Sequence, residues 1–298
     1  PALTLLAAQE NIQIPLVITQ PDRPRGRGKK LAPSPVKTAA IELGLEVFQP
    51  ETVNSQETES RLRALAPDFF VVAAFGQILS QKILNIPSVM PINIHASLLP
   101  RYRGAAPIQA AILNMDAVTG VTTMVMAKGM DAGDLLLSAT TPIGEQDTAQ
   151  DLHDRLGLMG ADLIVQTINQ VQEGRIKPKP QDPSQVTYAG MLKKSDGQIN
   201  WNLPARQIQA HVNAMTPWPG AFTRFRGRSI KIFKTRPLPT VTDFKPGVIF
   251  QCDKDGIQVS TGSGSLVILE LMGASGKRLS AMDFLCGAKI TPPIPFDI

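Results

Sequence analysis

The sequence predicts an α/β protein, with a doubly wound domain in its first half and a small β-barrel in its second half. In the first half, short apolar strands alternate with segments of helical periodicity, which is typical of a sheet covered by helices. In the second half, short strands are separated by turn residues, and one helix is expected at 204–215. We find no internal repeat.

The expected strands are short and rich in β-branched or aromatic residues. In the first half they lie at 16–19, 47–48, 69–74, 92–95 and 121–126, with helices at 33–43, 61–65 and 108–113. In the second half they lie at 230–233, 248–250, 257–260 and 266–271. The strand at 69–74 is apolar on both faces, as expected in the middle of a parallel sheet.

A proline-rich basic stretch separates the two halves. Before it, a long helix is expected from Thr148, where Thr148 and Asp151 form a capping-box pattern, to about Gly174. The stretch itself should be extended, because its prolines cannot continue a helix. The predicted organisation is a first domain at 1–173, a linker at 174–186 and a second domain at 187–298.

Composition excludes several classes of protein. Of the 298 residues, 43% are hydrophobic and 18% charged, which indicates a soluble globular protein without a membrane span. Two cysteines are too few for a disulfide framework or a thiolate zinc site, and no metal is expected. The net charge of +5 and the pI near 9.3 favour polyanionic partners without identifying one.

Three polar residues are candidates for catalysis. Asn93 and His95 share one face of a predicted strand at its carboxyl end, where doubly wound domains bind ligands. Asp131 lies on a glycine-containing turn after a later strand and could reach the histidine. Each residue alone also fits a structural role: His95 as a core histidine, Asn93 as a turn former and Asp131 in a solvated turn. Their joint pattern favours an active site, with an amide for an oxyanion and an imidazole for a proton.

The residues around this trio carry a resemblance. The run from Asn93 to Gly104, followed by Met-Asp-Ala-Gly-Asp at 130–134, resembles the formyltransferase domain of folate-dependent formyl transfer enzymes. The resemblance implies a Rossmann-like catalytic domain followed by an OB-like barrel, catalysis by Asn93, His95 and Asp131, and 10-formyltetrahydrofolate as co-substrate. It also implies folate binding by Ser97, Leu98, Leu99 and Pro100.

Three flanking segments resemble the branch of this family that acts on methionyl initiator tRNA: a basic loop, the Pro-Trp-Pro-Gly-Ala run at 217–221, and a closing strand region at 276–287. The loop holds five positive charges, which suit phosphate contacts. These tRNA-binding candidates are Arg23, Arg25, Arg27, Lys29 and Lys30. A solvated surface run is the alternative reading of the loop, and Trp201 and Trp218 are expected in the core.

The resemblance leaves rival functions open. One is a family member that acts on a small amine such as an amino sugar, or that hydrolyses formyltetrahydrofolate; another is a non-catalytic tRNA-binding module. The family's domain begins with a strand that this chain lacks, so we expect the natural protein to have further N-terminal residues. We also expect a monomer in the cytoplasm, with an organelle as the alternative.

Overall fold

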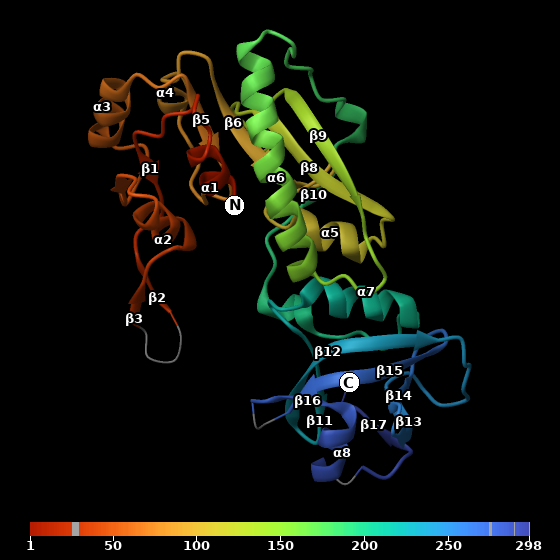
Figure 1. Ribbon diagram of the computed structural model, residues 1–298. Helices are drawn as coiled ribbons and strands as arrows, with labels where there is room; N and C mark the ends of the chain where they lie inside the picture. The colour runs from red at the N-terminus through yellow and green to blue at the C-terminus, as the bar shows by residue number, and fades with distance from the viewer. Residues whose placement is uncertain (26–29, 274–275, 289, 298) are drawn as a thin grey trace. The chain divides into compact units, whose positions relative to one another are not determined.

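The computed structural model describes residues 1–25, 30–273, 276–288 and 290–297, and it divides the chain into two compact units (Figure 1). The first unit comprises Pro1–Gly104, Gly120–Thr141 and Asp154–Tyr188, and the second comprises Ala105–Thr119, Pro142–His153 and Ala189–Ile298. Neither unit is a single stretch of sequence. The domain boundaries expected at residues 173 and 187 stay a prediction.

A four-stranded sheet forms the centre of the first unit. Its order is β5 (Phe69–Val72), β6 (Met90–His95), β8 (Val118–Val125) and β9 (Leu135–Pro142). β5 and β6 are parallel, as predicted, whereas β8 runs antiparallel to β6, with His95 opposite Thr122. The α/β class is confirmed, but the sheet is mixed.

A second, two-stranded sheet lies closer to the N-terminus. In it β1 (Val17–Ile18) pairs in parallel with β4 (Val47–Phe48). The helices of this region are α1 (Ala2–Ala7), α2 (Pro35–Glu42), α3 (Gln56–Leu65) and α4 (Gln81–Leu84). In the described part of the chain, no strand pairing joins this sheet to the four-stranded one. The strand expected before α1 stays a prediction.

The predicted start of the long helix is confirmed. α6 (Ala149–Gln172) begins with a capping box, in which the Asp151 N–H donates to Thr148 Oγ1 (3.3 Å) and the Thr148 N–H donates to the Asp151 carboxylate (2.9 Å). α5 (Pro107–Leu113) agrees with the helix expected at 108–113 and begins one residue earlier, at Pro107, a position that suits proline because its missing N–H is not needed there.

Apolar packing decides which face of β6 carries the polar residues. Ile92 is fully buried and packs with Ile164 and Ile168 of α6. Because side chains alternate along a strand, Asn93 and His95 point to the opposite face from Ile92. The two predicted catalytic side chains of β6 therefore share one face.

The second unit, which also contains α5, is built on an antiparallel sheet. Its strand order is β11-β12-β15-β14-β13-β17, and β16 pairs with β15. The elements are α7 (Ala205–Met215), β11 (Ala221–Phe225), β12 (Arg228–Leu238), β13 (Val248–Asp253), β14 (Gly256–Ser260), β15 (Ser265–Met272), β16 (Arg278–Ser280), α8 (Ala281–Ala288) and β17 (Ile294–Pro295). The Asp297 N–H donates to the Arg224 carbonyl (2.9 Å), which links the region after β17 back to β11. The predicted barrel is confirmed as a half-barrel.

The region expected to be a closing strand is mostly the helix α8. Only Arg278–Ser280 is a strand, and Ser280 then caps the helix, because its Oγ accepts the Asp283 N–H (3.1 Å). A serine before a helical run is a strong start signal. The expectation of a strand through this region was wrong.

The two tryptophans have different environments. Trp201 is 1% exposed, stacks on Phe296 with ring centroids 5.2 Å apart, and is a core residue as predicted. Trp218 is 52% exposed, so its expected place in the core was wrong. Pro217 and Pro219 flank it and cannot donate backbone hydrogen bonds, which favours a turn at the surface.

The partly buried His211 of α7 makes stability depend on pH. Burial lowers the pKa of His211 below its ordinary 6.5, with smaller opposing effects from the Gly197 carbonyl and Asp196. The unfolded chain therefore binds a proton at this residue at higher pH than the folded chain, and stability falls as the pH drops through about 6.5. We expect His211→Gln to lose less thermal stability than the wild type between about pH 7.5 and pH 5.5. The same change at the exposed His153 should leave the wild-type pH dependence intact, and equal curves for all three proteins would contradict this account.

Candidate active site

His95 is the last residue of β6, and its ring is almost fully buried. The Tyr102 carbonyl can only accept a hydrogen bond, so His95 Nε2 donates to it, at a distance of 3.0 Å. This contact fixes the ring and leaves Nδ1 to exchange a proton. Nδ1 lies 3.6 Å from Oδ2 of Asp131. The structure thus brings His95 and Asp131 together, although a backbone carbonyl, and not the carboxylate, accepts the ring's hydrogen bond.

Asp131 lies in a tight turn that presents its carboxylate. Its φ of 49° is in the left-handed region, which aspartate tolerates better than most side chains. Oδ2 accepts the Gly104 N–H (2.8 Å). The same oxygen therefore faces a backbone donor and the His95 ring, and it forms an ion pair with the ring when Nδ1 is protonated.

Asn93 lies two residues before His95 on the same face of β6. It is opposite Val72 in β5 and Met124 in β8, and its side chain is partly buried. Its side-chain amide can donate a hydrogen bond without transferring a proton. An amide, an imidazole and a carboxylate on one side of a sheet can stabilise an oxyanion and move a proton, which suits transfer of an acyl-type group.

The predicted folate-binding turn at 97–100 is held by its own polar groups. Ser97 is fully buried, and its Oγ donates to the Arg101 carbonyl (2.7 Å). Thr122 Oγ1 donates to the Ser97 carbonyl (2.7 Å) and accepts the Leu99 N–H (3.2 Å). The Ser97 side chain therefore shapes the turn, while Leu98 and Pro100 remain partly exposed. Sequence reasoning missed Thr122, which is one of three threonines in β8 and has nothing in the sequence to distinguish it.

Of the five basic residues predicted to bind tRNA, Arg23 and Arg25 lie in β2 (Arg23–Arg25) and Lys30 lies in β3 (Lys30–Ala32), and these two strands pair as an antiparallel hairpin. Arg23 is exposed. Arg27 and Lys29 lie outside the described residues, as do the side chains of Arg25 and Lys30.

Asp22, directly before β2, connects this hairpin to other residues of the first unit. Its carboxylate accepts hydrogen bonds from Gln49 Nε2 (2.8 Å) and Lys37 Nζ (2.7 Å). These contacts, that of Gln49 first, lower the pKa of Asp22. The carboxylate is therefore ionised near neutral pH and anchors the hairpin to α2.

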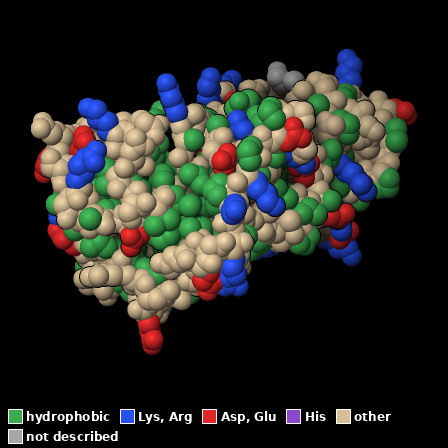
Figure 2. Space-filling model, turned by 90° about the horizontal axis from the view of Figure 1, so that it is seen from above, with side chains coloured by type: hydrophobic (Ala, Val, Ile, Leu, Met, Phe, Trp, Pro, Cys, Tyr) green, Lys and Arg blue, Asp and Glu red, His purple; other side chains and the backbone are tan. Residues whose placement is uncertain are grey.

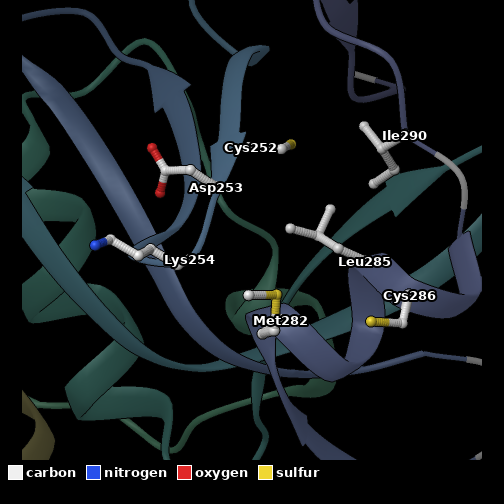
Figure 3. Close-up of a pocket in the computed structure, with 7 residues that line it drawn as sticks. All are labelled: Cys252, Asp253, Lys254, Met282, Leu285, Cys286 and Ile290. Carbon is white, nitrogen blue, oxygen red and sulfur yellow. The ribbon is translucent and has the colours of Figure 1, made fainter.

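A hollow in the second unit offers no comparable chemistry. Figure 3 shows its lining, with side chains of β13 on one side and of α8 on the other. Burial raises the pKa of the Cys252 thiol, so this sulfur is protonated near neutral pH and is a poor nucleophile. Within the described residues no cluster of three metal-ligating side chains occurs, and no helix is both long and apolar enough to cross a membrane.

Two family models match the chain: "Formyl transferase" over residues 3–168, and "Formyl transferase, C-terminal domain" over residues 191–289. The chain is 48% identical over 295 residues to a methionyl-tRNA formyltransferase of Geobacter metallireducens, covering 99% of this chain and 94% of that one. It is 43% identical over 291 residues to the methionyl-tRNA formyltransferase of Acetivibrio thermocellus, covering 97% and 93%.

Solved structures share the fold. An N-formyltransferase from Helicobacter canadensis, in complex with folinic acid and dTDP-3-aminofucose, matches with a TM-score of 0.65 and 19% identity over 90% of this chain and 93% of that one. HypX from Aquifex aeolicus, in complex with tetrahydrofolic acid, matches with a TM-score of 0.61 and 18% identity over 87% of this chain and 47% of that one. At these identities the likeness concerns the fold alone.

Proposed function

Because the chain belongs to the methionyl-tRNA formyltransferase family, we propose that it formylates the amino group of methionine on initiator tRNA, with Asn93, His95 and Asp131 as catalytic residues. The formyl donor is 10-formyltetrahydrofolate. The observation that carries the proposal is 48% identity over 99% of the chain. The contact between His95 and Asp131 supports the assignment of roles.

In this reaction the methionine amine attacks the formyl carbon, and the Asn93 amide donates a hydrogen bond to the oxyanion that forms. His95 acts through Nδ1, because its Nε2–H is held by the Tyr102 carbonyl. Asp131 stabilises the protonated ring from 3.6 Å. The proton lost by the amine ends on the folate nitrogen as the bond between that nitrogen and the formyl carbon breaks. The products are formylmethionyl-tRNA and tetrahydrofolate.

One assay separates this proposal from its rivals. The protein is given 10-formyltetrahydrofolate with methionyl initiator tRNA, with free methionine, or with a nucleotide-linked amino sugar, and formylated product is measured. We expect product with the tRNA substrate alone. Equal rates on all three acceptors would refute a tRNA enzyme, release of formate without an acceptor would indicate the hydrolase, and tRNA binding without any product would indicate a binding module.

We place the phosphate contacts of the tRNA at the β2–β3 hairpin, with Arg23, Arg25, Arg27, Lys29 and Lys30 as the contacting residues. Basic side chains are not gathered in one patch on the face seen in Figure 2, where lysine and arginine lie among acidic and apolar side chains. Charge alone therefore does not single out a binding surface on this face, whereas the run from Arg23 to Lys30 concentrates five positive charges within eight residues. We further propose that the protein acts as a monomer in the cytoplasm, with an organelle as the alternative.

A second surface suited to RNA surrounds Trp218. The exposed indole lies in a hollow of about 440 Å³ whose lining includes Phe222, Ser229 and two lysines, Lys194 and Lys231. An aromatic face beside ammonium groups suits a stacked base and its phosphate. We expect Trp218→Ala to weaken tRNA binding about 5- to 100-fold, the loss of one stacked base, while the KM for the folate is unchanged.

Phe244→Ala is the matched control for Trp218→Ala. Phe244 is also an exposed aromatic residue of the second unit, but it stacks on Phe250 and lies outside the hollow that contains Trp218. Its removal should leave tRNA affinity at the wild-type level. Unchanged tRNA affinity in the Trp218→Ala protein would contradict a stacking role.

A further inference from the structure

Gln181 is a buried residue in the segment expected to be a linker. This segment is held against the first strand residue of β9, because Lys179 and Leu135 exchange two backbone hydrogen bonds of 2.8 and 2.9 Å. Two residues later, Gln181 is only 9% exposed. A long polar side chain is rarely buried to this extent unless its hydrogen bonds are satisfied.

The Gln181 amide uses its full hydrogen-bonding capacity. Nε2 donates to the carbonyls of Asp131 (2.8 Å) and Gly133 (2.7 Å). Oε1 accepts from Nε (3.0 Å) and Nη2 (2.8 Å) of Arg103. A single side chain therefore joins the turn that carries the catalytic carboxylate to the guanidinium of a different segment.

These contacts close a ring around Asp131. Arg103 directly precedes Gly104, whose N–H donates to Oδ2 of Asp131 (2.8 Å). The carbonyl of Asp131 is thus held by Gln181, its carboxylate is held by Gly104, and Arg103 connects the two supports. Asp131 also has a φ of 49°, a conformation that persists only where the surroundings impose it.

We propose that Gln181, together with Arg103, is a positioning residue that holds the Asp131 carboxylate opposite His95. This inference rests on the proposed function, in which Asp131 is catalytic. Loss of the Gln181 amide leaves two carbonyls and a guanidinium without these partners, so the turn relaxes and Oδ2 moves from its place 3.6 Å from Nδ1. A displacement of about 1 Å at a reacting group can cost about 100-fold in rate.

The test is a double-mutant cycle on the full chain, with single-turnover formylation of methionyl-tRNA as the readout. We expect Gln181→Ala to lower the rate about 10- to 100-fold with little change in the KM for either substrate. In a protein that already carries Asp131→Asn, the same change should cost less than about 2-fold, because its effect acts through Asp131. A general structural role would lower the rate equally in both backgrounds.

The control is Gln185→Ala in the same segment. Gln185 is exposed and its amide bonds only Asp182 in the described structure, so we expect the wild-type rate. Arg103→Met is a second variant should Gln181→Ala fold poorly: it removes the donors to Oε1 and leaves the Asp131 turn bonded to the amide. The decrease in rate caused by Arg103→Met should also disappear in a protein that already carries Asp131→Asn.

The outcomes separate this inference from the proposed function. Equal, additive losses in the two backgrounds would overturn the positioning role, as would a Gln181→Ala protein with wild-type activity beside an inactive Asp131→Asn protein. Full activity of Asp131→Asn would instead overturn the catalytic assignment of Asp131 on which the inference rests.

Discussion

Replacing Asp131 with asparagine is expected to lower the rate of formylation about 100- to 10,000-fold, the range typical of a lost acid–base partner. The substitution conserves size, and the asparagine oxygen can still accept the Gly104 N–H, so the turn should persist. What disappears is the negative charge 3.6 Å from His95 Nδ1. The measurement is single-turnover product formation, with tRNA affinity and the thermal unfolding midpoint determined on the same protein.

Asp134→Asn provides the matched control for Asp131→Asn. Asp134 ends the same five-residue motif, and its side chain is exposed, while its backbone carbonyl accepts the Val125 N–H (2.9 Å). The control removes the same charge from the same turn without touching His95. If the two variants lose activity equally, the loss reflects the overall charge of the turn, and Asp131 has no specific catalytic role.

Much of the fold was predictable because its signals are local. The capping-box pattern of Thr148 and Asp151 predicts the start of α6, and Pro107 is the first residue of α5. The direction of β8 was not predictable in this way. Alternation of side chains indicates that a segment is a strand and which face is buried, but it is the same for parallel and antiparallel pairing.

Within the candidate site, the sequence could predict only those residues whose side chains are unusual for their position in the fold. Asn93 and His95 stood out as polar residues in an otherwise apolar strand, and Asp131 stood out as a carboxylate on a glycine-containing turn. The carbonyl of Tyr102 leaves no mark in the sequence, because every residue has a carbonyl. Gln181 was missed because its segment is rich in proline and basic residues, a composition that predicts an exposed linker.

Trp218 illustrates a limit of composition-based reasoning. Large aromatic residues are usually buried, and that expectation holds for Trp201, which is 1% exposed. It fails for Trp218 because the two flanking prolines favour a surface turn. Burial therefore depends on the backbone that carries a side chain as well as on its hydrophobicity.

Replacing Gly133 with alanine is the second change with a large expected effect, and the cause of this effect is a steric clash. A Cβ at this position would lie 1.7 Å from the Val125 carbonyl oxygen, a backbone atom that cannot rotate away. The turn from Asp131 to Gly133 must move as a whole to relieve this contact. We expect a loss of about 1–3 kcal/mol in the free energy of unfolding, as for other overpacked sites.

Activity of the Gly133→Ala protein should fall further than its stability alone implies. The Gly133 carbonyl accepts a hydrogen bond from Gln181 Nε2, so movement of the turn also disturbs the support of Asp131. We expect a rate about 100-fold below wild type under conditions where the protein is fully folded. Urea unfolding and single-turnover formylation, measured on one preparation, separate the two effects.

Gly157→Ala is the control that makes this prediction specific to Gly133. Gly157 lies within α6, and an added Cβ there would meet no atom within 4 Å. Alanine at a helical glycine should stabilise the protein by about 0.5–1 kcal/mol without a change in rate. If both alanine variants kept full activity, the close approach at Gly133 would not determine the position of Asp131, and the turn would tolerate displacement. If the Gly133→Ala protein alone lost activity while folded, the spacing between Val125 and the turn would be confirmed as a requirement of catalysis.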